Sequence, residues 1–237
     1  MYFCDMEKER SVEKMKKIKK LLSIFLAISL IVGLWQPLGN VKAEDNLLAG
    51  MELLAHYEFK EEGTDSSGKG NHATIGKNVT VKDGIASLPG GAANDSSFIE
   101  LPGKIFENQN HLTITMWLRD NDPQTSWLAA FFFGSKNNSN DKPTNYYYFN
   151  PCEKDKNTLK LVMTDSVDES NPGGTEKGFR NSIRTDSYQG IWTHYAIVID
   201  DYTMTCYIDG VSVGTQTVSR KVSDFGTNLD AYIGKSN

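Results

Sequence analysis

Apolar residues recur at every second position in two segments of the chain. Between residues 53 and 60 they are Leu53, Ala55, Tyr57 and Phe59. Between residues 112 and 118 they are Leu112, Ile114, Met116 and Leu118. Because successive side chains of a strand point to opposite faces, each set lies on one face. Both segments are therefore predicted to be half-buried strands.

Ten further short apolar segments are strand candidates. They are residues 79–81, 85–88, 98–101, 128–133, 146–149, 159–163, 192–199, 203–208, 211–218 and 232–233. Asp209-Gly210 lies between two of them and predicts a two-residue hairpin turn. No segment after residue 44 repeats apolar residues with a helical period, which excludes a parallel α/β fold with crossover helices. The pattern predicts an all-β fold, a two-sheet antiparallel sandwich of the jelly-roll type.

The first 43 residues have the three parts of a secretory signal peptide. A lysine cluster at residues 14–20 precedes an apolar run at 21–35, and Val41-Lys42-Ala43 has the small residues of a cleavage site. The run is shorter than the roughly 20 residues that span a bilayer. We expect cleavage after Ala43, a mature chain of residues 44–237, and a secreted or cell-surface protein without a membrane segment. A retained membrane anchor is the alternative.

The charge of the chain differs between its two parts. The whole sequence has 25 basic and 30 acidic residues, a net charge of −5. Residues 1–43 contain 8 of the basic and 4 of the acidic residues, so the predicted mature chain is strongly acidic. Nucleic acids and anionic lipid surfaces require basic patches. The sequence therefore argues against both as partners.

Three cysteines are too few for a disulfide scaffold or a multi-cysteine zinc site. Cys4 lies in the predicted signal peptide, which leaves Cys152 and Cys206. A secreted protein permits a disulfide between them, but spacing along the sequence does not fix the distance between their Cα atoms. A disulfide and two free thiols both stay open at this stage.

Several motifs occur in a fixed order and together carry a resemblance to a known family. They are LLAHYEF, DSSGKGNHATI, SFIELP, LTITMWLR, FFFGS, NYYYFNP, WTHYAIVID, CYIDGVSVG and AYIGKSN, and they cover nearly all of residues 52–237. In this order they resemble the laminin-G-like, concanavalin A-like jelly-roll modules of secreted bacterial polysaccharide-processing proteins. Such modules often accompany glycoside hydrolase domains that act on arabinan or xylan. The family's domain continues beyond YIGKS, so we expect residues 44–237 to be truncated before the last strand.

A catalytic site is not evident in the sequence. Glycosidases need a pair of carboxylates, and no predicted strand carries one. Glu153 and Asp155 lie in a lysine-rich turn, and Asp200-Asp201 follows a strand, where a structural role is favoured. No histidine pair has metal-ligand spacing, and His194, at a strand start, is interpreted as a packed core histidine. We therefore expect no enzymatic activity of this chain.

Aromatic residues next to polar side chains are the candidates for sugar binding, because rings stack on the C–H faces of sugars. The candidates are Trp127, Tyr146, Tyr148, Tyr188 and Trp117. The alternation of residues 146–148 directs at least one tyrosine outward. Trp117 lies either on an exposed sheet face or beneath a covering loop, and the resemblance favours the covered position.

Two loops contain residue types that calcium prefers. Asp65 and Asn71 lie in a Ser/Gly-rich loop, for which a structural Ca²⁺ ion and an ordinary turn are both open interpretations. Asp165, Asp168 and Glu169 lie in a second loop, where a solvated acidic loop is favoured over a calcium site.

Together these observations and the resemblance predict a non-catalytic, lectin-like carbohydrate-binding module. It would target a linked glycosidase, expected as a C-terminal catalytic domain of the full-length protein, to an extracellular polysaccharide such as arabinan or xylan. Two alternatives remain: a structural or adhesive laminin-G-like module without sugar binding, and a glycoside hydrolase on the same fold.

Overall fold

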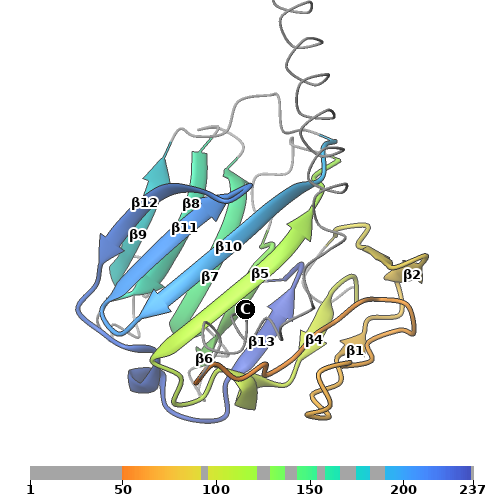
Figure 1. The fold of residues 1–237 in the computed structure, drawn as a ribbon, viewed down its shortest axis with the longest axis horizontal. Coiled ribbons are helices and arrows are strands. Elements are labelled where there is room, and N and C mark those ends of the chain that lie inside the picture. The colour runs from red at the N-terminus through yellow and green to blue at the C-terminus, as the bar shows by residue number, and fades with distance from the viewer. Residues whose placement is uncertain are drawn as a thin grey trace, which may run out of the picture. The chain divides into compact units, whose positions relative to one another are not determined.

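The computed structural model describes residues 50–91, 96–121, 129–136, 143–153, 158–165, 175–181 and 190–235 (Figure 1). The predicted signal peptide lies outside these ranges. Within them the regular structure consists of strands and two short 3-10 helices, η2 (Gly103–Ile105) and η5 (Val222–Phe225). No helix in the described part of the chain has the length and apolarity needed to cross a bilayer.

The strands form two main antiparallel sheets and a separate hairpin. The larger sheet contains, in spatial order, β1 (Thr74–Ile75), β4 (Ile99–Leu101), β13 (Asp230–Ile233), β6 (Phe131–Lys136), β7 (Pro143–Glu153), β8 (Thr158–Thr164) and β9 (Glu176–Asn181). The smaller sheet contains β12 (Val211–Thr217), β11 (Thr203–Ile208), β10 (Thr193–Asp200) and β5 (His111–Leu118). The hairpin pairs β2 (Thr80–Lys82) with β3 (Ile85–Ser87). In Figure 1 the smaller sheet lies in front of the larger one, as the two layers of a sandwich.

The core lies between the two sheets and is rich in aromatic residues. Phe133 of β6 stacks on Tyr147 of β7, with their ring centroids 5.3 Å apart. Phe149 of β7 meets Tyr195 of β10 edge to face, also at 5.3 Å, and so joins the two sheets. Rings of this size bury large apolar areas, and their stacked and edge-on contacts add to the stability of the core.

The all-β prediction is confirmed, and each of the ten short candidate segments overlaps a strand. Residues 112–118 fall within β5, where exposed and half-buried residues alternate along the strand as predicted. The Asp209-Gly210 hairpin is confirmed between β11 and β12, and both residues have positive φ angles, 48° and 79°. Positive φ at both central positions is the requirement of a type I′ turn. Two strands, β1 and β9, were not predicted.

The strand predicted for residues 53–60 was wrong. Tyr57 makes only an isolated bridge to Asp65, and Phe59 has a φ of 52° that interrupts extended backbone. Ala55, Tyr57 and Phe59 are nevertheless half-buried against the core, as their spacing predicted. The segment has the side-chain alternation of a strand but no partner strand to complete a ladder.

Both cysteines of the folded domain are free thiols, so the disulfide alternative was wrong and the alternative of two free thiols is confirmed. Cys206 lies in the core between the sheets, and burial raises the pKa of its thiol to about 12. Cys152 is also buried, in β7.

Candidate functional site

The face of the larger sheet that is turned away from the smaller sheet carries polar and aromatic side chains. Tyr147 points into the core, so its neighbours Tyr146 and Tyr148 lie on this outer face. Both tyrosines are nevertheless buried there, in a second hydrophobic cluster with Phe132 and Tyr232, so the prediction that one of them faces outward was wrong. The register places Lys160 of β8 opposite Arg180 of β9, and both residues share the outer face.

Three side chains meet around one carboxylate, that of Glu176. Lys160 Nζ lies 3.0 Å from Oε1 and 2.9 Å from Oε2 of Glu176. Arg180 Nη2 lies 2.6 Å from Oε2, and the hydroxyl of Tyr146 donates to Oε1 at 2.8 Å. Together with Tyr148, these residues are called the outer-face cluster.

The outer-face cluster combines burial with charge. The side chains of Lys160 and Glu176 are only 9% and 7% exposed, whereas that of Arg180 is 43% exposed. Removing charges from water is costly unless they are paired and hydrogen-bonded, and here the carboxylate faces two cations. Burial raises the pKa of Tyr146, and the Glu176 carboxylate raises it further, so this phenol remains a hydrogen-bond donor.

Aromatic rings extend the outer-face cluster along the sheet. Lys160 Nζ lies 5.0 Å from the ring centre of Tyr148, within the range of a cation–π contact. The ring of Phe132 stacks between those of Tyr146 and Tyr232, at 5.8 Å and 6.3 Å. The tyrosines at 146 and 148 are buried. They shape and support the cluster, and Arg180 presents its charge to solvent.

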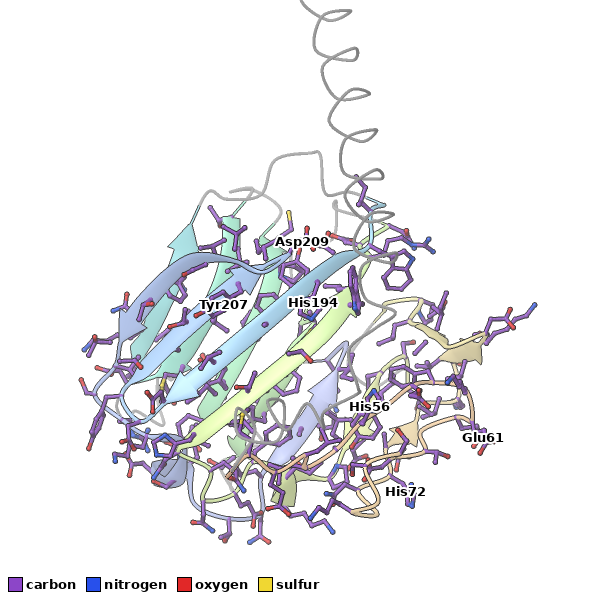
Figure 2. All side chains as sticks on the ribbon, viewed as in Figure 1. His56, Glu61, His72, His194, Tyr207 and Asp209 are labelled. Atoms are coloured by element: carbon purple, nitrogen blue, oxygen red, sulfur yellow. The ribbon has the colours of Figure 1, made fainter. Side chains whose placement is uncertain are left out.

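Trp117 lies on the other sheet, and its predicted position beneath a loop was wrong. Its side chain is 64% exposed on β5, and its ring centre lies 5.2 Å from that of His194 on the neighbouring strand. His194 is half-buried on the same outer face, so its interpretation as a core histidine was also wrong. Its backbone N–H donates to the carboxylate of Asp209 at 2.9 Å, near the start of β10; Figure 2 labels both residues.

Of the five predicted sugar-binding residues, the structure brings Tyr146 and Tyr148 together and separates Trp117 from them. Trp127 and Tyr188 lie outside the residues that the structure describes. Sequence reasoning missed the charged members of the outer-face cluster, Lys160, Glu176 and Arg180. One signal of this cluster was present in the sequence. Lys160 stands between Leu159 and Leu161, which indicates a strand with one apolar face and a second face that carries a charge.

Asp65 organises the loop for which calcium was one interpretation. Its carboxylate accepts hydrogen bonds from the backbone N–H groups of His56, Ser67 and Asn71, each at 2.9 Å, and from the Ser67 hydroxyl at 2.8 Å. The Asn71 side chain donates to the carbonyl of Leu54 at 2.8 Å. Figure 2 labels His56 and His72, which flank this loop. The four donors occupy oxygens that a cation would need, so the geometry fits a turn, and calcium at Asp65 and Asn71 stays an untested prediction.

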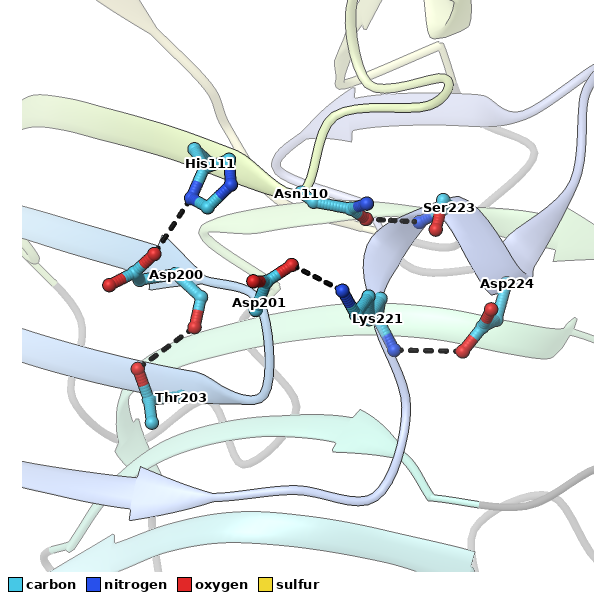
Figure 3. Close-up of polar contacts among 8 residues, drawn as sticks. All are labelled: Asn110, His111, Asp200, Asp201, Thr203, Lys221, Ser223 and Asp224. Carbon is cyan, nitrogen blue, oxygen red and sulfur yellow. Dashed lines mark hydrogen bonds and ion pairs between the residues drawn. The ribbon is translucent and has the colours of Figure 1, made fainter.

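Of the other acidic residues singled out in the sequence, Asp165, Asp200 and Asp201 have structural partners. Glu153 is the last residue of β7 and not part of a turn, so that interpretation was wrong, and Asp155 lies outside the described ranges. Asp200 contacts His111 at 2.7 Å, and Asp201 contacts Lys221 at 2.6 Å, where the chain enters η5 (Figure 3). These contacts support the structural role predicted for the pair. Asp165 contacts Lys177 at 2.6 Å, whereas Asp168 and Glu169 lie outside the described ranges. Among the residues with described positions, no three His, Cys, Asp or Glu side chains are grouped closely enough to hold a metal ion.

Comparisons with known proteins agree with this fold. The profile of a laminin-G family, Laminin_G_3, described as the concanavalin A-like lectin/glucanases superfamily, matches residues 93–237. Domain 4 of AbnA, a GH43 extracellular arabinanase from Geobacillus stearothermophilus solved with arabinotriose, superposes with a TM-score of 0.58 at 24% identity, covering 77% of this chain and 83% of that domain. The CBM40 domain of a Ruminococcus gnavus IT-sialidase, solved with α2,3-sialyllactose, gives a TM-score of 0.43 at 10% identity, covering 60% of this chain and 70% of that one.

A curated relative is also similar in sequence. It is a non-toxic nonhemagglutinin from Paraclostridium bifermentans, 25% identical over 201 residues, which are 79% of this chain. The matched region spans only 15% of that protein's length.

Proposed function

Since the chain belongs to the concanavalin A-like lectin/glucanase superfamily, we propose that its folded domain is a non-catalytic carbohydrate-binding module. The observation that carries the proposal is the outer-face cluster, where the exposed Arg180 is held by a buried carboxylate and backed by buried tyrosines on the sheet face opposite the inter-sheet core. Domain 4 of the arabinanase, which shares this fold, was solved with arabinotriose and supports the same class of ligand.

The role of such a module is to hold another activity near its substrate. We propose that the protein is exported and that the module keeps a linked glycosidase on an extracellular polysaccharide such as arabinan or xylan. A hydrogen bond to a sugar contributes only about 1 kcal/mol after desolvation. Single-site affinity is therefore expected in the micromolar to millimolar range, roughly −4 to −8 kcal/mol. A polymer that presents many copies of the ligand makes such weak binding effective.

The test is a glycan array probed with the purified chain, followed by affinity electrophoresis on the polysaccharides that bind. Arg180→Ala should weaken retention by about tenfold or more, because hydrogen bonds to charged groups contribute roughly 1.5–3 kcal/mol. Lys177→Ala is the matched control, since it removes one positive charge from the same strand at an exposed position outside the outer-face cluster. Thermal unfolding of both variants checks that the fold survives.

Absence of binding to every glycan on the array would contradict the proposal and favour a structural or adhesive module. Release of reducing sugar from arabinan, xylan or β-glucan would favour a hydrolase on this fold instead.

A further inference from the structure

We infer that the ligand of the outer-face cluster is an acidic sugar, with its carboxylate held by Arg180, the exposed cation of the cluster. This inference rests on the proposed carbohydrate-binding function and names the class of sugar. It follows from three properties of the cluster: its charge balance, the unused donors of Arg180 and its lack of a free charged acceptor.

The charge balance favours an anion. Lys160 and Arg180 supply two positive charges, and Glu176 supplies one negative charge. Tyr146 and Tyr148 add no charge, because a tyrosine hydroxyl is neutral near pH 7, and burial raises the pKa of Tyr146 further. The cluster therefore keeps one excess positive charge on a chain whose net charge is −5. A bound carboxylate would neutralise this excess.

The only charged acceptor of the outer-face cluster, the Glu176 carboxylate, is already occupied. Each oxygen of Glu176 has two donors, with Tyr146 and Lys160 on Oε1 and Lys160 and Arg180 on Oε2. Next to the cluster, Asn150 Oδ1 accepts from the backbone N–H of Cys152 at 2.8 Å. A sugar hydroxyl both donates and accepts. The O–H groups of a neutral sugar would therefore have no charged acceptor in this cluster.

The donors, in contrast, are not all used. A guanidinium has five N–H groups in a rigid fork, which matches the two oxygens of a carboxylate. Within the cluster, Glu176 engages only Nη2 of Arg180, and this side chain is the exposed one. A carboxylate accepts hydrogen bonds and donates none, so it complements a site that offers donors and few acceptors.

The experiment compares acidic sugars with matched neutral ones. Oligogalacturonides and glucuronoxylan oligosaccharides are titrated against the full chain, each beside a counterpart in which the carboxylate has been reduced to a hydroxymethyl group. Neutral arabinan and xylan oligosaccharides and a sulfated glycan complete the panel. We expect at least one acidic oligosaccharide to bind at least tenfold more tightly than its reduced counterpart.

Variants locate the effect. Arg180→Ala should abolish the preference for the acidic form, and Arg180→Lys should restore only part of it, because lysine keeps the charge but not the fork. Lys177→Ala should leave the preference unchanged. An equal loss in Lys177→Ala would instead mean unspecific electrostatic attraction and would overturn the inference.

The outcomes separate this inference from the proposed function. Binding of neutral oligosaccharides that is sensitive to Arg180 would overturn the acidic ligand and leave the carbohydrate-binding function standing. Binding of the sulfated glycan alone would overturn the carboxylate assignment. Absence of binding to every sugar would contradict both.

Discussion

Asp65 is the residue whose replacement should most clearly affect stability without touching the core. Its carboxylate is 5% exposed and accepts four hydrogen bonds that close the loop of residues 56–71. Asp65→Ala leaves three backbone N–H groups without this acceptor. An unsatisfied buried donor costs about 1–3 kcal/mol, and donors that water can reach cost less. Asn71 is buried, whereas His56 is exposed and Ser67 is intermediate, so we expect a loss of about 3 kcal/mol.

Urea unfolding followed by tryptophan fluorescence measures this loss. Asp65→Asn keeps one acceptor oxygen but turns an amide toward the other donors, so it should lose about 1–2 kcal/mol. Asp83→Asn is the matched control, because Asp83 is exposed and its φ of 53° is one that asparagine tolerates. If Asp65→Ala unfolds at the same urea concentration as the control, the carboxylate does not stabilise the loop and the reasoning is wrong.

The same residue gives the direction of a pH dependence. Burial raises the pKa of Asp65, but the hydrogen bonds from His56, Ser67 and Asn71 outweigh it and hold the pKa far below 3.8. Because the pKa of Asp65 is lower in the folded protein than in the unfolded chain, its stabilising effect is complete above pH 3.8. The effect is lost as the pH falls toward the pKa of Asp65 in the folded protein. The difference between wild type and Asp65→Ala should therefore shrink below that pH. Parallel curves with calcium and with EDTA test the calcium prediction, which a rise in wild-type stability with calcium would support.

Two further predictions concern the buried cysteines and a closely packed glycine. Cys152 and Cys206 should resist iodoacetamide in the native protein and react after unfolding. Peptide mapping by mass spectrometry measures the labelling of each cysteine. Fast labelling of Cys206 in the native protein would contradict its burial and its raised pKa. Gly103→Ala should cost about 1–3 kcal/mol in urea unfolding, because a Cβ there would clash with the backbone carbonyl of Leu229. Lys104→Ala, at an exposed neighbouring position, is its control, and equal stability of the two variants would show that the backbone adjusts freely.

The strands were predictable where the sequence contains its own periodic signal. The alternation in residues 112–118 predicted which side of β5 faces the core, and Asp209-Gly210 predicted a hairpin, because both depend on near neighbours. The segment at 53–60 shows the limit, since alternation predicts faces but not a hydrogen-bonded partner. β9 was not predicted, because Glu176, Lys177 and Gly178 have the polar composition of a loop. Their strand conformation depends on pairing with β8, which the local sequence does not indicate.

The candidate site was predictable only in part. Tyr146 and Tyr148 could be placed on one face because they lie two residues apart on one strand. Glu176 and Lys160 lie on different strands, and only the register of β8 and β9 brings them together. Trp117 could not be placed, because period two assigns it to the outer face without showing whether anything covers that face.

The position of β13 within the larger sheet sets the order in which the domain can be completed during synthesis. β13 pairs with β4 on one side and with β6 on the other, so Ala231 lies between Leu101 and Phe133. A ribosome makes both neighbours long before it makes β13, and non-local pairing of this kind is slow. Until then the nascent chain carries two unpaired strand edges, which are templates for association with other chains. The edges of β4 and β6 are therefore the segments for which a chaperone would matter most before β13 has been made.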